Sequence, residues 1–207
     1  MTHVIALDPH DRYGVLPASA ELPDGWRLTG WCGEEQTCRR QVAERPSAAL
    51  DTERLRLREV LPAEAPELKE GKSAGLDWLG GTPGEGSQEA AGLLAGAHAA
   101  GLHRSGWGMY VLVRREDGLV VGGMGFHGPP AEGHAEIGFD LHPDARGRGY
   151  ATEALSALAH WALRQDGVDT VLATTTQDNT PSQGVMERAG FGRRPDRDGL
   201  LVYALTR

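Results

Sequence analysis

A glycine-rich turn, Arg146-Gly147-Arg148-Gly149, leads directly into the most regular helical pattern of the chain, at about 149–165. A helix start exposes unpaired N–H groups and the positive end of the helix dipole. Glycines before it keep side chains away, so the phosphates of a ligand can approach the backbone. The turn therefore indicates a phosphate-binding loop, and the alternative is a glycine-rich surface turn that carries two arginines.

The helix after this turn has one apolar face, which constrains how it packs. The residues at helical spacing on that face are Ala151, Ala154, Leu155, Leu158, Ala159 and Ala162. Gly167 stands where glycine commonly ends a helix.

The loop lacks the Gly-Lys-Ser/Thr of a nucleotide-binding P-loop and the Gly-x-Gly-x-x-Gly of a dinucleotide-binding turn. Both of those phosphate-binding folds are therefore excluded.

The chain from residue 51 onward alternates predicted strands and helices. Period-two and β-branched patterns predict strands at 54–59, 109–113, 119–126, 134–141, 169–175 and 200–205. In the first of these strands, Leu55, Leu57 and Glu59 alternate with arginines that we expect to face solvent. Helices are predicted at 62–70, 89–100, 149–165 and 180–189. A strand meander followed by strand–helix–strand–helix–strand predicts a mixed α/β (α+β) domain.

The last predicted helix has a recognisable start. Thr180 is expected to cap it, Pro181 to occupy its first position, and Gln183 to complete a capping box.

Several motifs at matching distances resemble the GNAT family of N-acetyltransferases. Arg146-x-x-Gly149-x-Ala151 resembles the coenzyme-A signature of that family, and Glu136-Ile137-Gly138-Phe139 resembles its fourth strand. Asn179-Thr180-Pro181-Ser182 and the later Gly190-Phe191 are similar to the pattern of its ribosomal-protein N-terminal acetyltransferase branch. The resemblance covers residues 51–207. It implies a GNAT fold, in which a central, mostly antiparallel, splayed sheet is flanked by helices.

The resemblance also implies an activity: transfer of an acetyl group from acetyl-CoA to a primary amine by direct attack on the thioester. The acceptor would be a small molecule, an amino acid or a peptide, and no metal would be needed. The cofactor-binding residues implied are Phe139, Leu141, Arg146, Gly147, Arg148, Gly149, Tyr150, Ala151, Asn179 and Ser182. A backbone N–H near Phe139 would polarise the acetyl carbonyl.

Two residues are candidates for catalytic roles. Glu136 is the candidate base, acting directly or through water, and its alternative is a scaffold carboxylate that pairs with an arginine. Ser182 is the candidate for protonating the leaving thiolate, because the position where many relatives carry a tyrosine holds Met186 here. The alternative for Ser182 is a serine that only satisfies backbone groups at a helix start. His134 is kept as an alternative base.

Residues 1–48 have the pattern of a separate unit. Strands are predicted at 3–7, 12–16 and 26–31, a helix at 34–44, and a linker at 45–49. Tyr13-Gly14-Val15-Leu16-Pro17, Leu22-Pro23-Asp24-Gly25-Trp26, Cys38 and Arg45-Pro46-Ser47 resemble an MbtH-like domain. That resemblance implies binding to an adenylation domain of a nonribosomal peptide synthetase. The alternative is a small subdomain that only packs on the transferase.

Composition narrows the remaining partners. The net charge of −8 argues against nucleic acid as a partner, because phosphate neutralisation needs an excess of Lys and Arg. Two cysteines do not make a disulfide scaffold, and the scattered histidines do not have metal-ligand spacing. No apolar stretch reaches 18 residues and the N-terminus has no leader pattern, so we expect a cytoplasmic protein, monomeric or homodimeric.

The sequence therefore indicates two candidate functions. The first is an acetyl-CoA-dependent N-acyltransferase, whose acceptor could belong to a nonribosomal peptide or siderophore pathway. The second is an adenylation-domain partner whose transferase fold is accessory. In the fold that the resemblance implies, specificity for the acceptor lies in 71–106 and 127–133. Trp78 and Trp107 either shape that pocket or fill the core.

Overall fold

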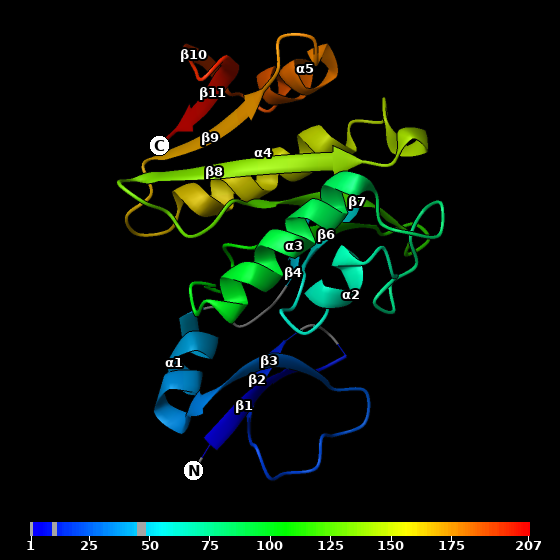
Figure 1. The fold of residues 1–207 in the computed structure, drawn as a ribbon, viewed down its shortest axis with the longest axis vertical. Helices are drawn as coiled ribbons and strands as arrows, with labels where there is room; N and C mark the ends of the chain where they lie inside the picture. The colour runs from blue at the N-terminus through cyan, green and yellow to red at the C-terminus, as the bar shows by residue number, and fades with distance from the viewer. Residues whose placement is uncertain (1, 10–11, 45–48) are drawn as a thin grey trace.

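The computed structural model describes residues 2–9, 12–44 and 49–207, and these form two sheets of very different size (Figure 1). A three-stranded sheet with one helix makes up the N-terminal unit. An eight-stranded sheet with four α-helices makes up the rest. The mixed α/β architecture is therefore confirmed.

The N-terminal unit has the predicted strand–strand–strand–helix order. Its elements are β1 (Thr2–Leu7), β2 (Tyr13–Pro17), β3 (Arg27–Glu34) and α1 (Glu35–Glu44). The strands are antiparallel in the order β2-β1-β3. The central strand β1 buries Ile5, Ala6 and Leu7, and helix α1 buries Cys38 against this sheet.

The large sheet runs in the order β10-β11-β9-β8-β7-β6-β5-β4. Its strands are β4 (Ala49–Asp51), β5 (Leu55–Glu59), β6 (Met109–Arg114), β7 (Val120–Phe126), β8 (His134–Leu141), β9 (Thr170–Thr175), β10 (Gly192–Arg197) and β11 (Leu200–Thr206). Strand β4 pairs with β5, so this sheet begins at Ala49, which the sequence had assigned to the linker. The remainder of that predicted linker, 45–48, lies outside the described residues.

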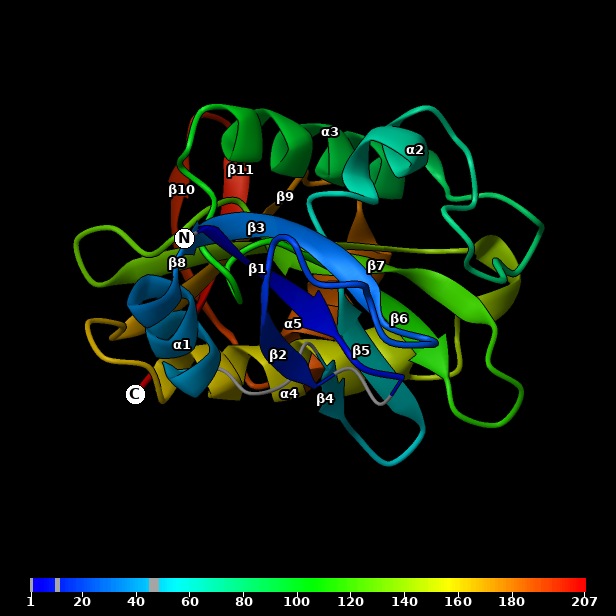
Figure 2. The ribbon, with the colours of Figure 1, turned by 90° about the horizontal axis from the view of Figure 1, so that it is seen from below.

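Helices cover both faces of the large sheet, as Figure 2 shows for α3 above it and α4 below it. The helices are α2 (Ala65–Lys69), α3 (Glu85–Ala99), α4 (Tyr150–Leu163) and α5 (Thr180–Arg188). Successive side chains of β6 point to opposite faces of the sheet, which explains the two layers of helices. Met109 and Val111 pack with α2 and α3. Tyr110 and Leu112 pack in the core that includes α4. The predicted apolar face of α4 is buried as expected.

The sheet opens between β8 and β9. β8 and β9 are parallel and pair only between His134–Glu136 and Thr170–Leu172. Beyond Glu136, β8 continues to Leu141 bonded to β7 on its other side. The splayed sheet expected from the sequence is therefore present.

One expectation about strand β5 is wrong. Arg58 was expected to face solvent, but it is 5% exposed and forms an ion pair with Glu64. The neighbouring Glu59 is fully buried and accepts hydrogen bonds from Tyr13 Oη (2.9 Å) and the N–H of Gly106 (2.5 Å). Glu59 therefore links the N-terminal unit to the large sheet.

Candidate active site

The predicted phosphate-binding loop lies between a short 3₁₀ turn (Pro143–Ala145) and helix α4. Gly147 and Gly149 have φ values of 72° and 80°, in the left-handed region that favours glycine. Gly149 is the N-cap of α4, and no side chain caps this helix. The first N–H groups of α4 are therefore available to an anion that binds at the loop.

Arg54, the residue just before strand β5, holds this loop in place. Its Nη1 donates to the carbonyl of Arg148 (2.8 Å), and its Nη2 lies 2.7 Å from the Glu153 carboxylate of α4. Its guanidinium also lies over the Tyr150 ring, 4.9 Å from the centroid. These contacts of Arg54 have no local sequence signal, because they join residues 94 and 99 positions apart.

A cavity of about 750 Å³ opens in front of the loop. It is lined by Phe139, Asp140, Leu141, Arg146, Gly147, Gly149, Tyr150, Ala151, Thr152, Asn179, Pro181, Ser182, Val185 and Arg188. We call it the loop cavity. All the predicted cofactor-binding residues line it except Arg148, which contributes its carbonyl to the contact with Arg54.

The far wall of the loop cavity is the start of α5, where two sequence expectations are wrong. Asn179 rather than Thr180 caps this helix, and its Oδ1 accepts from the N–H of Ser182 (3.3 Å). Gln183 makes no capping box, because its Nε2 donates to the carbonyls of Thr176 and Gln177. Met186 is 1% exposed and belongs to the core.

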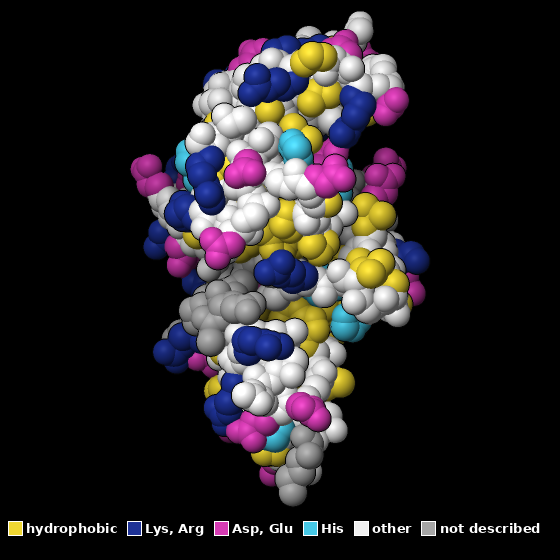
Figure 3. Space-filling view, turned by 90° about the vertical axis from the view of Figure 1, so that its left-hand side faces the viewer, with side chains coloured by type: hydrophobic (Ala, Val, Ile, Leu, Met, Phe, Trp, Pro, Cys, Tyr) yellow, Lys and Arg dark blue, Asp and Glu magenta, His cyan; other side chains and the backbone are white. Residues whose placement is uncertain are grey.

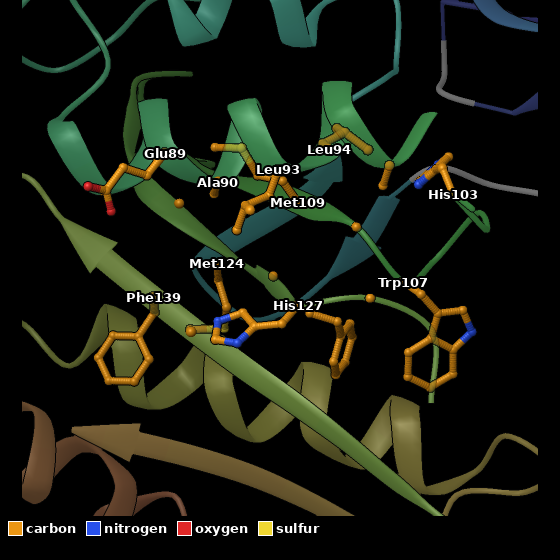
Figure 4. Close-up of a pocket in the computed structure, with 18 of the residues that line it drawn as sticks. Glu89, Ala90, Leu93, Leu94, His103, Trp107, Met109, Met124, His127 and Phe139 are labelled. Carbon is orange, nitrogen blue, oxygen red and sulfur yellow. The ribbon is translucent and has the colours of Figure 1, made fainter. Parts of the chain in front are cut away.

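A second cavity, of about 230 Å³, lies on the other face of the sheet, between α3 and strands β6–β8. We call it the α3 groove. Figure 4 shows Glu89 and Phe139 toward one end and His103 and Trp107 toward the other. The segments that the sequence analysis named for acceptor specificity contribute much of its lining: Gly86, Glu89, Ala90, Leu93, Leu94, Ala97, His103, His127, Gly128 and Pro129. Trp107 lines the groove and is also buried in the core, whereas Trp78 packs in the smaller core under α2 and α3.

Phe139 and Asp140 are the two residues that line both cavities. They lie on β8 just past the point where β8 and β9 stop pairing. A molecule in the loop cavity and a molecule in the α3 groove would therefore approach each other at this point of the strand.

Glu136 lies on the paired part of β8, outside the residues that line either cavity. Its carboxylate accepts from Arg197 Nη2 (2.8 Å) and from Thr174 Oγ1 (3.0 Å), and His127 Nδ1 is 3.8 Å away. Burial raises the pKa of Glu136, but the hydrogen bonds from Arg197 and Thr174 outweigh it and leave the pKa below its usual range. This geometry favours the alternative of a carboxylate paired with an arginine.

Asp140 is in the opposite electrostatic situation. Burial raises its pKa above the usual carboxylate range. The Ser87 hydroxyl donates to its Oδ1 (2.9 Å), which lowers the pKa but does not outweigh burial. The sequence analysis missed Asp140. The alternation of β8 could have found it, because residues two apart share a face and Glu136, Gly138 and Asp140 therefore point the same way.

Two histidines lie at the two ends of β8. His134 is exposed at the start of β8. His142 accepts from the N–H of Asp144 through Nδ1 (3.3 Å). Within the ranges that the structure describes, no three His, Cys, Asp or Glu residues are grouped so that they could hold a metal ion.

Comparison with known proteins gives a family match over most of the chain. Residues 54–192 match a family model described as an acetyltransferase (GNAT) domain. A curated relative, an uncharacterized N-acetyltransferase named YjdG from Bacillus subtilis, is 38% identical over 87 residues. That match covers 42% of this chain and 52% of the relative, so the chain spans about half the length of the curated relatives it matches.

Solved structures share the fold of the larger unit. An acetyltransferase from Agrobacterium tumefaciens is 29% identical, with a TM-score of 0.53 over 77% of this chain and 94% of the other. RimL, a ribosomal L7/L12 alpha-N-protein acetyltransferase solved with coenzyme A, is 20% identical, with a TM-score of 0.55 over 76% of this chain and 97% of the other. At that identity the second likeness concerns the fold alone.

Proposed function

Because this chain belongs to the GNAT acetyltransferase family, we propose that it transfers an acetyl group from acetyl-CoA, bound in the loop cavity, to a primary amine bound in the α3 groove. The observation that carries this proposal is that the two cavities reach the same point of β8 from opposite faces of the sheet. An amine in one and a thioester in the other can come into contact there, and holding both in place supplies much of the catalysis.

The residues of the loop fit a pyrophosphate. The uncapped N–H groups at Gly149, Tyr150 and Ala151 stand at the positive end of α4, and the exposed Arg146 adds a cationic side chain. Asn179 and Ser182 line the opposite wall, where the pantetheine arm would pass. A fold neighbour, RimL, was solved with coenzyme A, which is consistent with this use of the cavity.

The opening of the sheet supplies a place for the thioester. Near Phe139 the edge of β8 that faces β9 is not used by strand pairing, so a backbone N–H there can donate to the acetyl carbonyl. Such a donor stabilises the negative charge that develops on the oxygen as the amine attacks. Ser182 lines the same cavity, and we assign it the protonation of the leaving thiolate.

The α3 groove favours an amine attached to an apolar body. Trp107, Phe126 and Phe139 contribute aromatic surface, whereas Glu89 and Asp140 contribute carboxylates that attract an ammonium group. On the face in Figure 3, basic and acidic side chains are interspersed rather than gathered in one basic field.

A panel of primary amines tests the proposal. Arylalkylamines, aliphatic diamines, amino acids and short peptides with free N-termini would be incubated with acetyl-CoA, with thiol release and the acetylated product measured together. We expect acetylation of at least one apolar amine. Thiol release from acetyl-CoA with no acetylated amine anywhere in the panel would contradict the proposal.

Narrowing the α3 groove is expected to weaken acceptor binding alone. Ala90 lines the groove from α3, so Ala90→Phe should raise the KM for the amine about tenfold, the loss that goes with ~1.4 kcal/mol of binding. The Kd for acetyl-CoA, measured by calorimetry, should stay unchanged. Ala99→Phe is the matched control, because Ala99 is exposed near the end of the same helix and does not line the groove. Equal effects of the two substitutions would contradict this assignment.

The second candidate function concerns the N-terminal unit. Its three-stranded sheet and single helix are the order that the MbtH-like resemblance implies, and this is the observation that favours it. We keep adenylation-domain binding, and with it a role in nonribosomal peptide or siderophore synthesis in the cytoplasm, as a proposal. In the described part of the chain no helix is long and apolar enough to cross a membrane.

Affinity capture of purified adenylation domains by the full chain tests this candidate. We expect capture of at least one domain by the wild type. The loss of capture when Trp26, on the N-terminal unit, is replaced by alanine would support binding through that unit. If no domain of the panel is retained, the candidate is dropped, and the transferase proposal stands on its own test.

A further inference from the structure

Asp140 is the ionisable residue that lines both the loop cavity and the α3 groove. It lies on β8 next to Phe139, past the last pair of residues that joins β8 to β9. Its position differs from that of Glu136, which lies on the paired segment and lines neither cavity.

The carboxylate of Asp140 accepts a hydrogen bond from helix α3. Ser87 of α3, itself fully buried, donates its hydroxyl to Oδ1 at 2.9 Å. The nearby backbone N–H groups of Ser87 and Gly123 also favour the charged form of this carboxylate, because they lower its pKa. Glycines allow this close approach, since a Cβ at Gly86 would lie 3.0 Å from the Asp140 Cβ and a Cβ at Gly123 would lie 3.1 Å from Oδ1.

We infer that Asp140, rather than Glu136, is the catalytic base of this chain: it binds the ammonium group of the acceptor and removes one proton from it. This inference rests on the proposed function. It identifies the acceptor as an amine that enters the site as a cation, with its charge at the end of the groove nearest the loop cavity.

The proton balance of the reaction follows from this role. The ammonium group gives one proton to the Asp140 carboxylate and becomes a neutral amine. The nitrogen lone pair then forms a C–N bond to the acetyl carbon, and the C–S bond breaks with its electron pair on sulfur. Ser182 gives its hydroxyl proton to the thiolate and takes up the second proton from the nitrogen in return, so the products are the amide, coenzyme A with its thiol, and protonated Asp140. Loss of that proton to water restores the base.

The pKa of Asp140 suits a catalytic base better than the pKa of Glu136 does. Burial raises the pKa of Asp140, whereas the ion pair with Arg197 and the hydrogen bond from Thr174 offset burial and lower the pKa of Glu136. A carboxylate whose pKa is raised takes a proton more readily near neutral pH.

The other ionisable groups near Asp140 come from four segments of the chain. Arg146, from the loop, lowers the pKa of Asp140. Glu85 at the start of α3 and His142 after β8 share a small cavity with Asp140, and Glu89 and His127 share the α3 groove with it. Arg146 is a permanent cation, so its effect does not vary with pH across the range measured.

The test is the pH dependence of acetylation by Asp140→Asn, with the best amine of the panel as the probe. Asparagine keeps the shape and can still accept from Ser87, but it cannot take a proton. We expect kcat/KM at pH 7 to fall about 100-fold, a typical contribution of a base, with most of the loss recovered near pH 10, where more of the amine is already neutral. The Kd for acetyl-CoA should stay at the wild-type value, which shows that the variant is folded. Asp166→Asn, on the exposed turn after α4, is the matched control.

The pH profile of the rate of Ser87→Ala is a second measurement. A purely structural role of Asp140 would leave this profile unchanged. The Ser87 hydroxyl lowers the pKa of Asp140, so its removal should raise that pKa and shift the acidic limb of the rate profile to higher pH. Activity at alkaline pH should be retained, since the base itself is still present.

The outcomes separate this inference from the proposed function. Wild-type acetylation with an undiminished Asp140→Asn rate would overturn the inference and leave the function standing. A loss in Glu136→Gln in place of Asp140→Asn would assign the base to Glu136. A wild type that acetylates no amine of the panel would overturn the function, and the inference with it.

Discussion

Replacing Gly149 by glutamate is expected to abolish acetyl-CoA binding. Gly149 has a φ of 80° and is the N-cap of α4, so a side chain there strains the backbone that aims the N–H groups at the ligand. The added carboxylate also repels the pyrophosphate. Losing only two charge-assisted hydrogen bonds, at ~1.5–3 kcal/mol each, weakens the Kd by at least about 100-fold. Isothermal titration calorimetry measures this change.

Gly167→Glu is the matched control for that substitution. Gly167 has a φ of 78°, is exposed, and lies just past the other end of the same helix, away from the loop cavity. It therefore carries the same backbone strain and the same charge without touching the cofactor. We expect its Kd for acetyl-CoA to match the wild type. Equal weakening by both substitutions would show that the loss comes from destabilisation of α4 and not from the loop.

Replacing Leu155 by alanine is expected to cost the most stability of the changes considered. Leu155 is fully buried on α4, in the core cluster that joins this helix to the large sheet. A Leu→Ala change in a packed core costs about 2–5 kcal/mol, from lost burial and from the cavity that remains. Urea unfolding followed by circular dichroism measures the difference.

Leu102→Ala serves as the control, because Leu102 is 69% exposed in the loop after α3. A surface substitution of this kind changes stability by no more than ~0.5 kcal/mol. If Leu155→Ala and Leu102→Ala unfold at the same urea concentration, α4 does not pack on the sheet as described.

Elements with strong periodicity could be predicted from the sequence. The apolar face of α4 and the bounds of β8 follow from spacing alone, because these segments bury one face. Strand β10 was missed because all its residues, Gly192–Arg197, are exposed and carry no apolar alternation. The cap of α5 was misplaced by one residue, since Asn179 and Thr180 are both good capping residues and only the backbone geometry distinguishes them.

The part of the candidate site that is built from neighbouring residues could be predicted from the sequence. The loop at Arg146–Ala151 is local, so its glycines and the helix after it are visible in the sequence. The state of Glu136 depends on Arg197, 61 residues away, and Asp140 depends on Ser87, 53 residues away. Contacts of that separation are fixed by how the sheet and α3 pack, and no local pattern encodes them.

The most direct test of the account follows the backbone amides during a titration with acetyl-CoA, by ¹H–¹⁵N correlation spectra of the wild type. We expect the largest shifts at Gly147, Gly149, Tyr150 and Ala151, with further shifts at Phe139 and Asn179, where the thioester and pantetheine would lie. Binding that shifts amides elsewhere and leaves those of the loop unchanged, or no binding at all, would contradict it.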